Sequence, residues 1–295
     1  MRVAKATPPT KDLSKLITAI DSDELVVGVR DVPEDDWLNL GIPELNEIIT
    51  GNRKHGIPLG CTVEISGDSQ TGKTKLMAHL MRRVQKKGGI VALADAESSF
   101  NKKYVTKVHK VDTDAIMLIK TNVIERIIAI IGKVIKARKK ELTKANMTYE
   151  KLVPVIMFID SFKMCVSEKE VKAGEDNYGG YGTARTMAFS QQYPKVHYQL
   201  CQFRITVVWI NQVRAKFGFM QSGKESTGGE GMKFYPDIRL RLKNLGRIKK
   251  TKNKIEKVIG RKVEIECIKT RFNEPNGKIR VQMMHKGGYT LLEGK

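Results

Sequence analysis

Apolar residues follow two repeating patterns along this chain. Short continuous runs predict strands that are buried on both faces. These runs lie at residues 62–66, 89–94, 115–119, 154–159 and 206–210. Between them, a leucine and methionine stripe predicts a helix over 74–87, and an isoleucine stripe predicts a crossover helix over 124–138. A solvated, lysine-rich turn should follow, to about Tyr149. Strands that alternate with helices predict an α/β fold with a mostly parallel central sheet flanked by helices.

The N-terminal segment carries elements of its own. Residues 11–20 place their leucines and isoleucines on one face of a short helix, and residues 24–30 alternate like a strand. This small helix-strand segment has little core to cover, so we expect it to dock on another copy of the chain. We therefore assign residues 1–35 to oligomerisation and residues 36–295 to the core, where residues 37–49 read as a turn and a helix.

One glycine-rich stretch separates the first core strand from the helix that follows. The stretch Gly67-Asp68-Ser69-Gln70-Thr71-Gly72-Lys73-Thr74 matches the pattern G-x-x-x-x-G-K-[ST]. Its glycines let several backbone N–H groups point at a triphosphate, and the positive end of the helix adds to the attraction. Lys73 offers a cation to the β- and γ-phosphates, and Thr74 offers a hydroxyl to Mg²⁺. An ordinary glycine-rich turn is the alternative, which the position between strand and helix disfavours.

Acidic residues follow two of the predicted strands. Asp160 ends the run 154–159, so the strand delivers it to the carboxyl edge of the sheet, near the phosphate loop, where it should hold Mg²⁺. The alternative role for Asp160 is to cap the next turn. Glu97 follows the run 89–94, at a position from which a carboxylate can orient an attacking water. An exposed glutamate in a salt bridge fits the position of Glu97 equally well.

Two further stretches combine cations, aromatic rings and glycines. They contain Tyr178, Tyr181 and Arg185 in the first stretch and Arg214, Lys216, Phe217, Gly228 and Gly229 in the loop 213–233. Cations neutralise the phosphates of a nucleic-acid strand and rings stack on its bases, so both stretches are candidate DNA-binding loops. The alternative for the second stretch is a flexible surface loop. A predicted basic hairpin within 243–271 is a further candidate, or equally a solvated edge.

Composition favours a polyanionic partner. The chain has 295 residues, 41% of them hydrophobic, and a formal net charge of +21, which indicates nucleic acid rather than an acidic membrane. It has no apolar segment of about 18 residues and no secretion signal at its start, so we expect a cytoplasmic location. Its four cysteines lie far apart without a C-x-x-C pair, which indicates reduced, mostly buried thiols and neither zinc nor disulfides.

From about Leu38 to Thr290 the chain resembles RecA-type homologous recombinases, and among them the short UvsX-like proteins of phages. Besides the phosphate loop, the resemblance rests on the motifs 94–97, 159–161, 209–214 and 227–235. It implies a RecA-like P-loop ATPase core. It also implies a DNA-dependent ATPase that releases ADP and phosphate, forms helical filaments on single-stranded DNA, and catalyses pairing and strand exchange with double-stranded DNA in recombination and repair.

The resemblance implies roles for single residues in the ATP site. Glu97 looks like the base that activates water, and Lys73 is a second candidate catalytic residue. Gln212 looks like the sensor that joins the γ-phosphate to the loop behind it. Tyr104 falls where the family stacks an aromatic ring on adenine, and Asn101 stands nearby.

Other implied roles concern DNA and the neighbouring protomer. Residues 178–182 and 214–229 resemble the family's two DNA-binding loops, and Phe217 is placed like its wedge between base triplets. Lys269 and Arg271 look like the paired cations that enter the ATP site of the next protomer.

The chain also departs from the family pattern. It stops soon after a predicted strand at 278–284, which implies no separate C-terminal domain and favours a phage source, hence the host cytoplasm. Single-strand-binding and mediator proteins are the further partners that the resemblance suggests. A hexameric helicase of the same fold stays open as an alternative. A recombinase paralogue that uses ATP as a switch also stays open, although Glu97 speaks against it.

Overall fold

The computed structural model describes residues 32–144, 148–173, 181–215, 224–252, 255–274, 277–285 and 288–292. The predicted helix 11–20 and strand 24–30 lie outside these residues, as do Tyr178, Lys216 and Phe217. From Asp36 onward the chain forms one compact unit.

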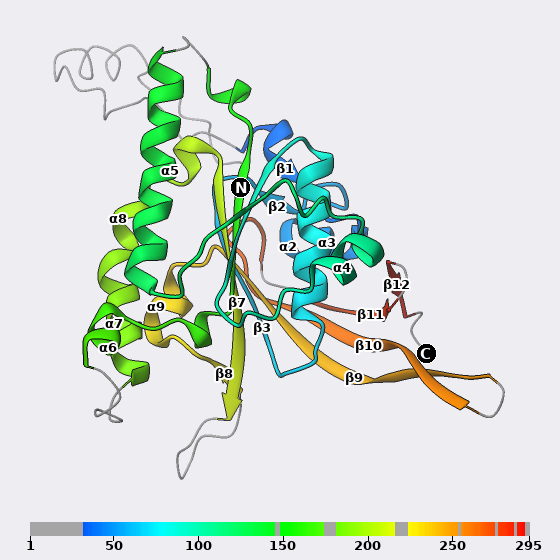
Figure 1. The fold of residues 1–295 in the computed structure, drawn as a ribbon. Coiled ribbons are helices and arrows are strands. Elements are labelled where there is room, and N and C mark those ends of the chain that lie inside the picture. The colour runs from blue at the N-terminus through cyan, green and yellow to red at the C-terminus, as the bar shows by residue number, and fades with distance from the viewer. Residues whose placement is uncertain are drawn as a thin grey trace, which may run out of the picture. The chain divides into compact units, whose positions relative to one another are not determined.

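This unit is built on a central sheet (Figure 1). In the described part of the chain the sheet has ten strands in the order β12-β11-β10-β9-β3-β7-β6-β4-β5, with β8 paired to β7. The strands are β3 (Thr62–Gly67), β4 (Ile90–Asp95), β5 (Ile116–Leu118), β6 (Val155–Asp160), β7 (Ile205–Ala215), β8 (Lys224–Ser226), β9 (Ile238–Lys252), β10 (Ile255–Lys269), β11 (Lys278–Met284) and β12 (Tyr289–Leu291). A separate pair joins β1 (Trp37–Leu38) to β2 (Ile57–Pro58). From β9 through β3, β7, β6 and β4 to β5 every pairing is parallel, which confirms the predicted α/β class.

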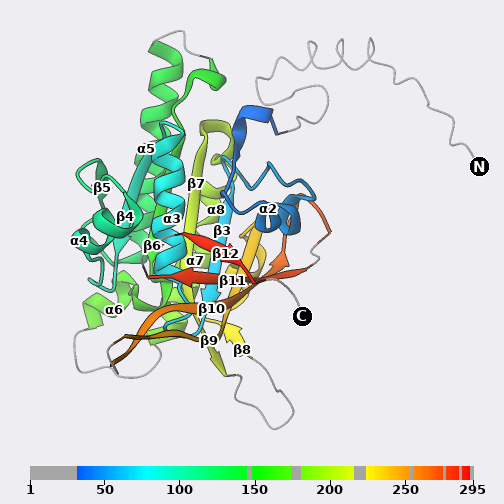
Figure 2. The same cartoon turned by 90° about the vertical axis from the view of Figure 1, so that its right-hand side faces the viewer.

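Helices cover both faces of the parallel strands (Figures 1 and 2). They are α2 (Pro43–Thr50), α3 (Lys73–Lys86), α4 (Lys102–Tyr104), α5 (Ile124–Lys144), α6 (Glu168–Ala173), α7 (Tyr181–Gln192), α8 (Pro194–His197) and α9 (Gly229–Phe234). Successive strand residues divide between the faces: Ile156 and Phe158 of β6 join the core with α2 and α3, whereas Met157 and Ile159 join the core with α5, α7 and α8. Because both faces are covered, the strands read as continuous apolar runs.

Two predicted elements differ from the observed ones. The run 115–119 forms an edge strand, β5, whose Met117 and Leu118 are 45% and 56% exposed, so the prediction of a buried strand is wrong there. The lysine-rich segment after Arg138 continues α5 to Lys144 and is not a turn. Arg138 supports this extension, because its guanidinium donates to Glu141 and, at 2.6 Å, to the carbonyl of Val153.

The region after Gln212 also departs from expectation. The described segments of the predicted loop 213–233 contain regular elements, because β7 continues to Ala215, β8 pairs with it in antiparallel fashion, and α9 follows. The basic hairpin is confirmed as β9 and β10, which project together beyond the helical layers (Figure 1).

Cysteines and membrane segments can be judged within the described ranges. Cys61, Cys165 and Cys267 are buried and Cys201 is exposed, as expected for mostly buried thiols, and all four are free in this structure. In the described part of the chain, no helix has the length and apolar character needed to cross a bilayer.

Candidate nucleotide site and DNA-binding loops

The phosphate loop lies between β3 and α3, as its sequence predicts. The ammonium of Lys73, the first residue of α3, donates to the carbonyls of Gly67 at 3.0 Å and Asp68 at 2.7 Å, and so lies inside the loop. Burial lowers the pKa of Lys73, while the carboxylates of Asp160 and Glu97 oppose this shift. Gly72 has φ 95°, and a Cβ there would lie 2.5 Å from Met283 Sδ, so this turn needs glycine.

Asp160 ends β6 beside the start of α3. Its Oδ2 accepts a hydrogen bond from the Thr74 hydroxyl at 3.3 Å. Asp160 is only 4% exposed, and burial, assisted by the charges of Glu97 and Asp95, raises its pKa to about 6. A hydroxyl and a carboxylate at one point suit Mg²⁺, which takes few protein oxygens and keeps water or phosphate as its other ligands. The described residues contain no cluster of three or more His, Cys, Asp or Glu that would make a fuller metal cage.

Glu97 lies just beyond β4 and is linked to the neighbouring strands. Its Oε1 accepts hydrogen bonds from the Ser161 hydroxyl at 2.6 Å and from Nε2 of Gln212 at 3.2 Å. Lys163 in turn donates to Oε1 of Gln212 at 2.7 Å. The structure therefore brings Glu97 and Gln212 together, as the resemblance implied. It also adds Ser161 and Lys163, to which the sequence analysis assigns no role.

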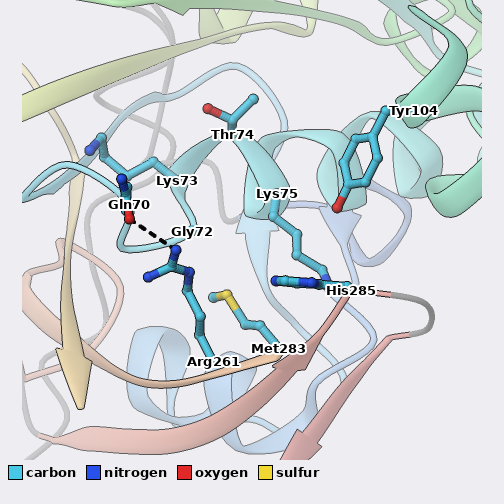
Figure 3. A pocket seen from close by; sticks show the side chains of 9 residues that line it. All are labelled: Gln70, Gly72, Lys73, Thr74, Lys75, Tyr104, Arg261, Met283 and His285. Atoms are coloured by element: carbon cyan, nitrogen blue, oxygen red, sulfur yellow. Dashed lines mark hydrogen bonds between the residues drawn. The ribbon is translucent and has the colours of Figure 1, made fainter. Parts of the chain in front are cut away.

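A cavity of about 260 Å³ opens beside the phosphate loop (Figure 3). Its lining is formed by Gln70, Gly72, Lys73, Thr74, Lys75, Tyr104, Arg261, Met283 and His285. Tyr104 is exposed at the end of α4, and Asn101 caps this turn by accepting from the Tyr104 backbone N–H at 2.9 Å. Asn101 thus positions Tyr104 and is not itself among the lining residues. Arg261 of β10 donates to Gln70 at 3.0 Å, which ties the basic hairpin to the phosphate loop.

A buried polar network missed by the sequence reasoning joins β3 to the end of the second candidate DNA loop. Glu64 is fully buried; its carboxylate accepts from Arg239 at 2.6 Å and from Asn211 at 2.9 Å. The same Asn211 amide donates to the Thr227 carbonyl at 2.5 Å. Thr227 is also bonded to the Gln212 carbonyl through its N–H and its hydroxyl, each at 3.1 Å. The network joins β3 to β7 and β9, which lie more than 130 residues further along the chain. No local sequence motif therefore reveals it.

The candidate DNA residues fall into four groups, of which Arg185 forms the last. Tyr178, Lys216 and Phe217 lie outside the described residues; Tyr181 begins α7 and Arg214 lies in β7, but only their backbones are described. Gly228 and Gly229 lead into α9 with φ 121° and 61°. A Cβ on Gly228 would come within 2.5 Å of Met232 Cγ, so this glycine has a packing role.

Arg185 requires a correction. The residue is 8% exposed, and its guanidinium donates to the carbonyls of Lys163 at 2.5 Å and Cys165 at 2.9 Å. It also lies over the Phe162 ring, 5.4 Å from the centroid. The prediction that Arg185 contacts a DNA phosphate is wrong for this arrangement, because its charge is directed inward. It anchors α7 to the turn that carries Lys163.

Lys269 and Arg271 are not among the residues that line the cavity beside Lys73. The Lys269 ammonium donates to the carbonyls of Lys233 at 3.0 Å and Phe234 at 2.7 Å, at the C-terminal end of α9. Burial, followed by the charge of Arg271, lowers the pKa of Lys269. Arg271 pairs with Asp237 at 3.3 Å and remains mostly exposed. A cation is favoured at the C-terminal end of a helix, so the end of α9 holds Lys269 next to the last residues of the second candidate loop.

Comparison with known proteins adds to this geometry. The family model of the RecA N-terminal domain matches residues 47–290. The chain is 29% identical to protein RecA of Rhodospirillum centenum over 240 residues, covering 80% of this chain and 61% of that protein. It is 29% identical to RecA of Rhodopirellula baltica over 259 residues, covering 87% and 62%. It is 30% identical to RecA of Cytophaga hutchinsonii over 273 residues, covering 92% and 68%. The chain thus spans less than two thirds of the length of the first two of these relatives.

Proposed function

The chain belongs to the RecA family, and from this premise we propose that it is an ATP-dependent recombinase, which assembles as a helical filament on single-stranded DNA and exchanges strands with duplex DNA. One observation carries the proposal most directly. Glu97, at the mouth of the phosphate loop, is hydrogen-bonded to Gln212, and the strand of Gln212 leads straight into the second candidate DNA loop. A nucleotide and a DNA strand would therefore act on two ends of the same connection.

In the proposed reaction, the phosphate loop and Lys73 bind the triphosphate. Thr74 and Asp160 would hold Mg²⁺, which supplies positive charge to the phosphate oxygens. Glu97 takes a proton from water as the water oxygen bonds to the γ-phosphorus, and the bond from that phosphorus to the ADP oxygen breaks. Ser161 fixes the Glu97 carboxylate through the 2.6 Å hydrogen bond, so that one carboxylate oxygen is held and the other is left to face water.

DNA enters this proposal through the second loop. Binding of a strand to that loop would act on the chain between β7 and β8, and Gln212 would transmit the change to Glu97. The high positive charge supports a polyanionic partner. Lys269 and Arg271 would complete the site of the next protomer, since open helical filaments are built from heterologous contacts. A cytoplasmic location, help from single-strand-binding or mediator proteins, and a phage source remain parts of the proposal that rest on the sequence.

ATP hydrolysis measured with and without single-stranded DNA tests the proposal, together with electron microscopy of the same mixtures. We expect DNA to stimulate hydrolysis severalfold and continuous helical filaments to form with ATP. A closed ring that moves along DNA would instead support a helicase. An ATP hydrolysis rate that is the same with and without DNA, in a protein shown to bind ATP, would contradict the proposed connection.

A further inference from the structure

Lys75, one residue beyond Thr74 in α3, has an unusual environment. Its side chain lines the cavity beside the phosphate loop, yet its ammonium is buried and has no hydrogen-bond partner among the described residues. Figure 3 shows the side chain running toward His285, between Tyr104 and Met283, while Lys73 points to the opposite side. The two lysines therefore serve different ends of the cavity.

A lysine near the end of a helix ordinarily extends its flexible stem until the ammonium reaches water. Lys75 does not, although an unpaired buried charge lowers the stability of the folded chain. None of the ion pairs found in the described ranges supplies it with a carboxylate. The fold alone therefore gives no reason to keep an ammonium at this position.

Two neighbouring side chains share this property. Nε2 of His109 and the hydroxyl of Tyr289 are also buried without hydrogen-bond partners in the described chain. His109 packs edge-on against Tyr104 with ring centroids 5.7 Å apart, and Tyr289 packs against His79 of α3 at 4.9 Å. Unsatisfied polar atoms thus gather behind the Tyr104 end of the cavity. Buried polar groups are nearly always satisfied, so such a group points to a missing partner.

We propose that Lys75 donates a hydrogen bond to the base of the bound nucleotide and so contributes to nucleotide affinity. This inference rests on the proposed function, because it takes the ligand of the cavity to be a nucleoside triphosphate. The phosphates belong with Lys73 in the loop, and an aromatic ring such as Tyr104 suits the flat face of a base. An ammonium has three donors and no acceptor, so its partner must be a ring nitrogen or a carbonyl on the edge of that base.

The substitution Lys75→Met tests this, because methionine keeps most of the stem and removes the charge. Two ligands, ATP and inorganic tripolyphosphate, are titrated with Mg²⁺ by calorimetry, and the melting temperature is measured without ligand. We expect ATP to bind at least about 10-fold more weakly, as for loss of a charged hydrogen bond, with tripolyphosphate affinity unchanged. We also expect the ligand-free variant to melt a few degrees higher, because a buried unpaired charge has gone.

The matched control is Lys86→Met, which removes the same charge from the exposed last turn of α3 and should change neither affinity nor melting temperature. Lys75→Gln keeps hydrogen-bond donors without the charge, so it should lose less ATP affinity than Lys75→Met. It replaces Lys75→Met in the titrations if the methionine variant does not fold. Equal losses for ATP and tripolyphosphate would overturn the proposal, because Lys75 would then serve the phosphates. Unchanged ATP affinity would overturn it as well. A parent protein that binds neither ligand would refute the proposed function itself.

Discussion

Asp160→Asn should make the nucleotide-free protein more stable while abolishing Mg²⁺-dependent ATP hydrolysis. The carboxyl group is 4% exposed, and burial together with the charges of Glu97 and Asp95 raises its pKa from 3.8 to about 6. Asparagine has nearly the same shape and can still accept the hydrogen bond from Thr74. The substitution therefore removes the buried negative charge and little else.

The size of the effect follows from the pKa shift of Asp160. Because folding raises this pKa, the native chain binds more protons than the unfolded chain between pH 3.8 and about 6, and stability falls as pH rises through that window. About two pKa units, at about 1.4 kcal/mol each, give roughly 3 kcal/mol of lost stability above pH 6. We expect Asp160→Asn to recover most of this at about pH 7.5 and roughly half of it at about pH 5.

Urea denaturation of the ligand-free protein at these two pH values measures the difference. Asp114→Asn is the matched control, because its side chain is 83% exposed and its pair with Lys102 lies at the surface, where such pairs contribute little. An Asp160→Asn variant no more stable than its parent at pH 7.5 would refute the reasoning, and so would a gain in stability that does not shrink at the lower pH.

Three other predictions concern the proposed reaction and its connection to DNA. Lys73→Ala should weaken ATP binding, whereas Glu97→Gln should keep ATP and DNA bound but stop turnover; hydrolysis by Glu97→Gln at the parent rate would rule out Glu97 as the base. Arg185→Ala should destabilise the fold by about 2–4 kcal/mol, because it leaves buried carbonyls unpaired, yet leave the salt dependence of DNA binding unchanged; a shallower slope in a salt titration would restore Arg185 as a phosphate contact. Glu97→Gln and Lys269→Ala should each be inactive alone but recover ATPase activity in mixed filaments, since some junctions then join two intact halves; mixtures no more active than the sum of their parts, in filaments shown to contain both variants, would contradict a shared site.

Local patterns in the sequence predict the parts of the site that a short segment builds by itself. The phosphate loop needs only a strand, two glycines and the start of a helix, and all of these are adjacent in the chain. Asp160 was predictable because a buried run ends at it and parallel strands meet at one edge. Tyr104 came from the resemblance alone, since a three-residue helix gives no periodic signal.

Long-range pairing decides what the sequence could not predict. The network of Glu64, Arg239 and Asn211 depends on the register that places β3 between β7 and β9. A glutamate within an apolar run indicates a polar partner but does not say which one. Arg185 was misjudged for a similar reason: its cationic character and glycine-rich surroundings resemble a DNA contact, whereas tertiary packing directs it onto two carbonyls.

The sheet also limits how the candidate DNA loop could act on the candidate ATP site. β7 is paired with β6 through Ile210 and with β3 through Gln212, which lies opposite Gly67 at the start of the phosphate loop. Sliding β7 by one residue would move every buried side chain to the wrong face, so the strand cannot carry a signal by changing register. Among the described residues, β7 beyond Gln212 is paired with β8 alone, and β8 lies off the main strand order of the sheet. In the proposed mechanism, a signal from the candidate DNA loop would therefore reach the candidate ATP site through a twist of β7 beyond that point and a reorientation of the Gln212 side chain, while Glu64 and Asn211 hold the strand behind it.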